Sequence, residues 1–141
     1  MRLLERRFRV KVALEEAWAH VAKVTEWPTW ATHIRRIDLT AAGPLTAQSE
    51  GTIVLRNGIR STFRMMELNP GVNWRWTGPF LWLSVDYDHL FHRVASQEAE
   101  IEFLVNAEGF GVGILGRLFA VVYAFNLDRA IARLIVAIEK S

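Results

Sequence analysis

The chain has 141 residues, of which 51% are hydrophobic and 23% charged, a composition typical of a globular domain rather than a disordered chain. Lys and Arg number 17 against 15 Asp and Glu, so the net charge is only +2 and no basic stripe of the kind used by nucleic-acid-binding proteins is expected. Cysteine is absent, which excludes disulfides and thiolate metal sites.

Targeting and membrane-spanning segments are not indicated by the sequence either. Residues 1–7 contain no apolar core of signal-peptide length. The longest apolar stretch, residues 109–125, is interrupted by Arg117 and is shorter than the roughly 18 apolar residues that a membrane span needs. We therefore expect one cytoplasmic domain over residues 1–141, without nucleic-acid partners and without stable membrane insertion.

The first thirty residues predict a strand followed by two short helices. Charged and apolar side chains alternate over residues 4–12, which indicates a strand with one wet face. Leu14, Trp18 and Val21 then recur at helical spacing. In the segment that follows, residues 24–30, Pro28 suits the first turn of a second short helix, and the flanking Trp27 and Trp30 form a bulky corner.

From Ile34 to Val105 the pattern is extended, with further strands at residues 53–56, 59–68, 72–77, 81–94 and 99–105. Asn57-Gly58 is a strong signal for a tight hairpin, because both residues tolerate positive φ. The strands follow one another through short turns, without crossover helices. This order predicts an antiparallel meander.

The last predicted helix, residues 114–140, has two apolar faces that do not line up. In its second half one face carries Leu127, Ile131, Leu134, Ile135 and Ile138. Extended backward, that face carries only Gly116, Ala120 and Ala124, whereas the large residues of the first half lie nearly opposite: Ile114, Leu118, Val121, Val122 and Phe125. Three explanations are open: a kink near Asn126, an exposed face that a second subunit or a membrane surface covers, or a first half that roofs a ligand cavity.

In this order the elements resemble the START-like helix-grip superfamily, in particular its polyketide cyclase/dehydrase and lipid-transport-like branch. The segments that carry the resemblance are Ala17-Trp18, Trp27-Pro28-Thr29-Trp30, Ser49-Glu50-Gly51-Thr52, Glu67-Leu68-Asn69-Pro70-Gly71, Trp74-Arg75-Trp76-Thr77-Gly78, His89-Leu90-Phe91 and the closing stretch from Asn126 to Glu139. The resemblance implies an α+β helix-grip fold, in which a curved antiparallel sheet of about seven strands wraps a long C-terminal helix and two short helices follow strand one.

The resemblance also implies a cavity between the sheet and the last helix. The side chains expected to line it are Trp27, Trp30, Phe63, Trp74, Trp76, Tyr87, His89, Phe91, Phe103, Leu118 and Val122. On the strand over residues 81–94 the inward assignment assumes that no β-bulge intervenes, because one bulge exchanges His89 for His92. The alternative to a ligand cavity is an ordinary core filled by these aromatic rings.

His89, Tyr87 and Arg93 are the titratable side chains placed by this pattern on the inward face or at its end, and they are the candidate catalytic groups. His89 and His92 lie three residues apart on a strand, so they point to opposite faces and are not expected to share a metal ion. No nucleophile motif or nucleotide-binding glycine loop is present. We therefore expect neither a metal nor a cofactor.

The first functional hypothesis is the binding of a small hydrophobic molecule, aromatic, polyketide-like or lipid-like, in this cavity. One alternative is a cyclase, dehydratase or isomerase that uses His89 as general acid or base, with Tyr87 or Arg93 polarising a carbonyl. A second is dimerisation or attachment to a membrane surface through the helix face over residues 114–125. The expected partner is a small hydrophobic ligand, and the sequence leaves a homodimer open.

Overall fold

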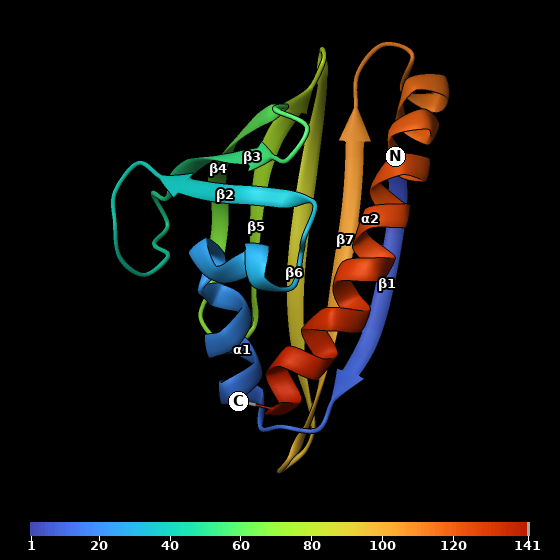
Figure 1. The fold of residues 1–141 in the computed structure, drawn as a ribbon. Coiled ribbons are helices and arrows are strands. Elements are labelled where there is room, and N and C mark those ends of the chain that lie inside the picture. The colour runs from blue at the N-terminus through green and yellow to red at the C-terminus, as the bar shows by residue number, and fades with distance from the viewer. Residues whose placement is uncertain (141) are drawn as a thin grey trace.

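The computed structural model describes residues 1–140 and has ten helices and strands within that range. Seven strands form one antiparallel sheet in the order β1-β7-β6-β5-β4-β3-β2 (Figure 1). The strands are β1 (Arg2–Val10), β2 (Ile34–Leu39), β3 (Glu50–Leu55), β4 (Arg60–Asn69), β5 (Asn73–Phe80), β6 (Leu83–Ala95) and β7 (Glu98–Glu108). The helices are α1 (Leu14–Ala22), the 3₁₀ helix η1 (Val24–Thr29) and α2 (Val112–Lys140). The predicted α+β helix-grip architecture is confirmed.

Alternation of side chains defines an inner and an outer face of the sheet. On β6, Leu83, Val85, His89 and Phe91 are buried. The pairing of β6 with β5 has no register shift, and its pairing with β7 shifts only between Arg93 and Ala95. The assumption that no bulge interrupts this strand around residue 89 therefore holds, and His89 points inward.

Tight turns connect β3 to β4 and β5 to β6. Gly58 has φ +91°, so the predicted hairpin around Asn57-Gly58 uses the conformation that glycine adopts most easily. The β5–β6 turn differs, since Leu81 occupies the left-handed region with φ 55° and is the only non-glycine residue of the described chain with a positive φ. Its side chain is exposed.

The two short helices cover one part of the inner face of the sheet. α1 has Glu15 and Glu16 in its first turn, where carboxylates favour the helix dipole, and it buries Ala17 and Val21. The ring of Trp18 meets those of Trp74 and Phe91 edge-on, at centroid distances of 5.3 and 5.0 Å. These aromatic contacts attach α1 to β5 and β6.

The long helix α2 is unbroken from Val112 to Lys140 and runs alongside β1 and β7, with its C-terminal part leaning toward α1 (Figure 1). Gly116, Leu127, Ala130, Leu134 and Ile138 are its buried residues. Two polar contacts fix α2 to β1 and its following turn: Arg6 Nε donates to Asp128 at 2.6 Å, and the backbone N–H of Lys11 donates to Glu139 at 2.8 Å.

The structure shows which side of the first half of α2 faces the sheet and which side is exposed. Leu115, Phe119 and Tyr123 are half-buried on the side of the sheet. Ile114, Leu118, Val121, Val122 and Phe125 are all exposed. The helix has no break near Asn126 that turns these five side chains inward, so the structure agrees with the second explanation in having an exposed apolar face. In residues 1–140 no helix is long and apolar enough to cross a membrane.

Candidate functional site

A small hollow lies where η1, β6, β7 and α2 meet, and its volume is about 50 Å³. Its lining includes Trp27, Trp30 and Ala31 from η1 and the residues after it, Tyr87 and His89 from β6, Phe103 and Val105 from β7, and Tyr123, Leu127 and Ala130 from α2. We call this hollow and its lining the aromatic chamber. Ligand pockets commonly measure about 300–1,000 Å³. The chamber as it stands therefore has room for one or two water molecules only.

His89 is the titratable residue at the centre of the chamber wall. Its side chain is 6% exposed, and its Nδ1 lies 3.1 Å from the carbonyl oxygen of Trp74. Because a carbonyl only accepts hydrogen bonds, Nδ1 carries the proton and Nε2 keeps its lone pair. Burial lowers the pKa of His89 to about 4, against a smaller opposing effect of the Trp74 carbonyl. At neutral pH the residue is an uncharged hydrogen-bond acceptor through Nε2.

Aromatic rings enclose this imidazole. His89 stacks on Trp74 with ring centroids 4.5 Å apart, and Trp76 meets it edge-on at 5.0 Å. The rings of Trp27 and Phe103 lie at 5.8 and 5.5 Å. This apolar enclosure is the reason that the charged form of the imidazole is disfavoured.

Tyr87 and Tyr123 bring two phenol groups to the chamber from opposite walls, β6 and α2. Their ring centroids are 5.7 Å apart. Burial raises the pKa of both hydroxyls well above the ordinary range, so both remain protonated. Neither hydroxyl has a hydrogen-bond partner within residues 1–140. The chamber therefore combines two neutral donors with the acceptor nitrogen of His89.

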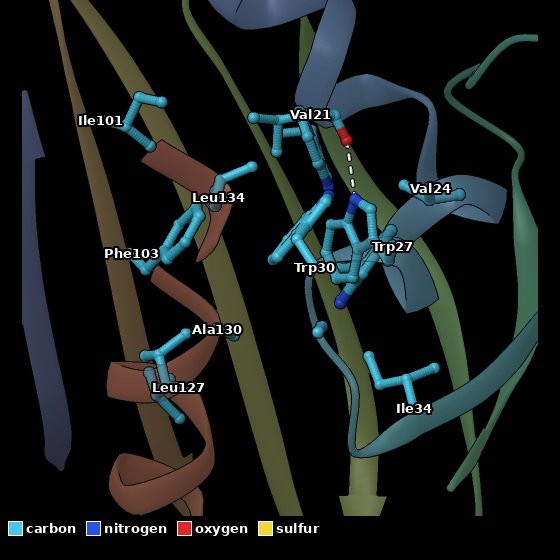
Figure 2. Packing of buried hydrophobic residues seen from close by; sticks show 14 of the residues in the cluster. Val21, Val24, Trp27, Trp30, Ile34, Ile101, Phe103, Leu127, Ala130 and Leu134 are labelled. Atoms are coloured by element: carbon cyan, nitrogen blue, oxygen red, sulfur yellow. Dashed lines mark hydrogen bonds between the residues drawn. The ribbon is translucent and has the colours of Figure 1, made fainter. Parts of the chain in front are cut away.

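The η1 wall of the chamber is fixed by one buried hydrogen bond. Trp27 Nε1 donates to the carbonyl oxygen of Val21 at 2.8 Å. Figure 2 shows Trp27 and Trp30 on one side, with Phe103, Leu127 and Ala130 opposite. Between η1 with its following link and α2, the described chain makes one hydrogen bond, from Arg133 Nη1 to Thr32 Oγ1 at 2.7 Å. These two walls are thus held together mainly by side-chain packing.

The sequence-predicted lining residues divide into three groups. Trp27, Trp30, Tyr87, His89 and Phe103 line the chamber. Four others are buried in the surrounding core: Phe63, Trp74, Trp76 and Phe91. Leu118 and Val122 are exposed on the outer face of α2, so the structure does not bring them to the chamber.

Arg93, the third candidate catalytic residue, also lies elsewhere. It is exposed at the end of β6 and pairs with Glu15 of α1, so it does not join Tyr87 and His89. His92 lies on the outer face 3.7 Å from Glu102, opposite to His89 as expected for a strand. No group of three His, Asp or Glu side chains in the part of the chain that the structure describes is placed to hold a metal ion.

The sequence analysis missed Tyr123, Leu127 and Ala130 as chamber residues. A signal for them exists, because residues at positions i, i+4 and i+7 share one helical face. That face continues forward to the buried Leu134. The prediction instead named the larger side chains Leu118 and Val122, which lie on the opposite side of the helix.

Two larger hollows occur elsewhere on the molecule. A groove of about 800 Å³ runs between α1, η1, β2 and the loop before β3, and a shallow depression of about 560 Å³ lies over β4, β5 and the β5–β6 turn. Neither contains a buried titratable group with a shifted pKa. Because titratable groups with strongly shifted pKa values cluster at functional sites, we take the aromatic chamber as the candidate site.

Comparison with solved structures shows the same fold in several proteins. A protein from Thermobifida fusca is 13% identical, covers 97% of this chain and 93% of its own, and superposes with a TM-score of 0.78. The Zhui aromatase/cyclase from Streptomyces sp. R1128 is 11% identical, with 97% and 93% covered and a TM-score of 0.74.

The di-domain ARO/CYC BexL of the BE-7585A biosynthetic pathway is 17% identical, with a TM-score of 0.69 over 97% of this chain. The chain spans only 45% of that protein. No curated protein sequence matches the chain. At these identities the likeness shows the fold alone.

The family model described as polyketide cyclase/dehydrase and lipid transport matches residues 1–138. This match confirms the resemblance that the order of the sequence motifs indicated. The chain belongs to the polyketide cyclase/dehydrase and lipid-transport family.

Proposed function

We propose that this protein binds a small, largely apolar molecule with at least one aromatic ring and one hydroxyl or carbonyl group in the aromatic chamber. The observation that carries the proposal is the meeting of three uncharged polar side chains, Tyr87, His89 and Tyr123, on a mainly apolar hollow whose lining also includes His33 and Asp88. Tyr87 and Tyr123 supply donors without protein partners, and His89 supplies an oriented acceptor. A few polar groups within an apolar lining are characteristic of small-molecule sites.

The ligand class follows from this lining. Flat aromatic walls favour a flat ring system, because offset-stacked and edge-on ring contacts add to the burial of apolar area. A phenol or enol hydroxyl donates to His89 Nε2, and a carbonyl accepts from Tyr87 or Tyr123. The family supports an aromatic, polyketide-like chemistry for such a molecule, as do two structural neighbours that are named as ARO/CYC and aromatase/cyclase proteins.

Loading requires the chamber to widen, because about 50 Å³ does not hold a ring system. The chamber opens where η1 packs against α2. Across this contact the two walls share no β-sheet ladder, and the one hydrogen bond between them in the described chain is the exposed Arg133–Thr32 bond. Trp27 and Trp30 move with η1, so their fluorescence reports the opening.

The alternative function, a cyclase or dehydratase with His89 as general base, has less support. An orienting partner is present in the Trp74 carbonyl, but a pKa of about 4 makes the imidazole a weak base at neutral pH. Arg93 does not reach the chamber to polarise a carbonyl. The same neutral imidazole serves well as a binding acceptor.

The test compares the native and denatured masses of freshly purified protein, then measures binding of hydroxylated naphthalenes and anthraquinones by tryptophan fluorescence. We expect either a co-purifying small molecule or saturable binding. Tyr123→Phe, which removes one hydroxyl, should weaken binding about tenfold, the effect of one lost hydrogen bond. The matched control Ile59→Ser, on an exposed turn, should leave binding unchanged. A protein that carries no molecule and binds none of these probes contradicts the proposal.

A further inference from the structure

Eight large hydrophobic side chains on the β5–β6 turn, the turn before α2 and the first half of α2 are exposed, each between 59% and 89%. They are Leu81, Trp82, Phe110, Ile114, Leu118, Val121, Val122 and Phe125. We call this set the apolar face. A hydrogen bond of 2.7 Å from Trp82 Nε1 to the carbonyl oxygen of Phe110 joins the β5–β6 turn to the turn before α2. Figure 1 shows these two turns at the same end of the sheet.

The apolar face is the outer side of a helix segment whose inner side is also apolar. Ile114, Leu118, Val121 and Phe125 follow one another at steps of four, three and four residues, which places them along the side opposite to Gly116 and the sheet. A helix that is apolar all round is ordinarily buried. With on the order of 100–200 Å² per side chain, the face exceeds the roughly 300–600 Å² of the largest patch on a typical monomer.

The charges around this face are mainly basic. Between residues 109 and 127 the only charged residue is Arg117. The guanidinium of Arg129 lies over the Phe125 ring, 5.5 Å from its centroid. The nearest acidic residues along the chain are Glu108 and Asp128, and Asp128 is neutralised by Arg6 at 2.6 Å. An anionic partner therefore complements the rim of the face.

These charges distinguish between two partners for the apolar face: a second copy of the chain and an anionic lipid surface. A second copy packed through the same face brings another Arg117 and Arg129 to the interface. Helix α2 offers them no unpaired carboxylate, because Asp128 pairs with Arg6 and Glu139 accepts from Lys11. Between residues 108 and 129 only Glu108, at the end of β7, is an acidic residue without an ion pair, so two arginines of each copy would face one such carboxylate. An anionic lipid surface supplies acyl chains for the apolar residues and phosphates for the two arginines. We propose that the apolar face attaches this protein to an anionic phospholipid membrane.

In the attached state α2 lies parallel to the membrane plane with its outer side at the boundary of headgroups and acyl chains. Leu118, Val121 and Phe125 enter the apolar layer, while Arg117 and Arg129 extend to the phosphates. Leu81 and Trp82, in the β5–β6 turn, contact the membrane beside the start of α2. Leu81 keeps a large apolar side chain in a left-handed conformation that usually favours glycine, in agreement with a role for that side chain outside the fold. The proposal rests on this surface alone and is independent of ligand binding in the chamber.

The experiment measures co-sedimentation of the full chain with vesicles of phosphatidylcholine alone and of phosphatidylcholine mixed with phosphatidylglycerol. We expect binding to the mixed vesicles that weakens with salt. The double variant Leu118→Ser/Phe125→Ser should reduce this binding at least tenfold, because both side chains are exposed and their loss removes apolar area from the contact. The matched double variant Ile59→Ser/Val72→Ser changes two equally exposed side chains outside the face and should bind like the natural sequence.

Two further readouts define the orientation and the role of charge. Trp82 is the one tryptophan among the described residues that is mostly exposed, so brominated lipids should quench it, and Trp82→Phe should remove most of that quenching. Arg117→Glu/Arg129→Glu should abolish the preference for the anionic vesicles. Circular dichroism and urea unfolding establish that each variant is folded.

Several outcomes overturn the proposal. One is a failure of the natural sequence to bind mixed vesicles at low salt. Another is equal loss of binding in both serine double variants, and a third is equally tight binding to neutral vesicles. A dimer in light scattering that Leu118→Ser/Phe125→Ser converts to a monomer, without vesicle binding, identifies a second copy of the chain as the occupant instead.

Discussion

The imidazole of His89 stacks on the indole of Trp74 with ring planes 19° apart, while its Nδ1 is hydrogen-bonded to the carbonyl oxygen of the same tryptophan. The two residues are register partners on β5 and β6. Trp74 therefore fixes the position and the tautomer of His89, while burial keeps the imidazole uncharged at neutral pH. This relationship makes His89 a fixed hydrogen-bond acceptor rather than a proton carrier at neutral pH, in agreement with the proposed binding role.

Protonation of His89 should destabilise the fold. Its pKa is about 4 in the folded protein, against an ordinary value near 6.5 in an unfolded chain. Between these values the unfolded chain binds a proton that the folded chain does not. Above about pH 6.5 His89 is uncharged in both states, and its full contribution to the free energy of unfolding is present. As the pH falls from about 6.5 toward about 4, the free energy of unfolding decreases, by roughly 2 kcal/mol at pH 5.

Urea unfolding of the natural sequence and of His89→Gln at pH 7, 6 and 5 measures this effect. Burial also lowers the pKa values of His20 and His33, and these contributions cancel in the comparison because both proteins retain the two residues. We expect a smaller loss of stability with falling pH in His89→Gln. Identical pH dependence in the two proteins contradicts the buried, neutral state of His89.

Trp76 should be one of the largest single contributors to stability. It is 2% exposed, and its ring lies 4.2 Å from that of Phe63 and 5.4 Å from that of Trp27. Trp76→Ala should cost about 3–5 kcal/mol in the free energy of unfolding, since it removes apolar contacts and leaves a cavity. The control Trp82→Ala, at a 64% exposed position, should cost less than about 1 kcal/mol. Equal costs in urea unfolding contradict this account of the core.

Two glycine-to-alanine substitutions should have effects of opposite sign. A Cβ on Gly78 overlaps the carbonyl oxygen of Thr62 on the neighbouring strand, so Gly78→Ala should cost more than about 2 kcal/mol. Gly113 lies in α2 with open space around its Cα. Gly113→Ala should stabilise the protein by about 0.5–1 kcal/mol, because alanine loses less backbone entropy in a helix. Thermal and urea unfolding of both variants decide the signs.

The hydrogen bond from Trp27 to Val21 should contribute to holding the chamber wall. The Val21 carbonyl lies in the last turn of α1, where no later N–H of the helix can satisfy it. Trp27→Phe keeps an aromatic ring but leaves this buried acceptor unpaired, at an expected cost of about 1–3 kcal/mol. Trp82→Phe removes an exposed bond that water replaces and should cost much less. Similar costs in urea unfolding mean that the buried bond has no special role.

Most helices and strands, and their order along the chain, could be predicted from the sequence. Alternation over β1 and β6, helical spacing in α1, and the Asn57-Gly58 turn are local signals, because side-chain direction follows from backbone geometry within a few residues. The inward orientation of His89 followed from the same alternation, once no bulge intervened. The family could also be predicted from the sequence, because the order of motifs along the whole chain is more specific than any single motif.

The contacts between distant elements could not be predicted from local sequence patterns. The pairing of β1 with β7 brings residues about one hundred positions apart into register, and no local pattern encodes such a partner. Packing against the sheet selected Phe119 and Tyr123 rather than Leu118 and Val122 as the inner side of α2, because both sides of that segment are apolar and periodicity alone ranks them equally. The volume left inside depends on how the rings interdigitate, and that is a property of the packed molecule rather than of its sequence pattern.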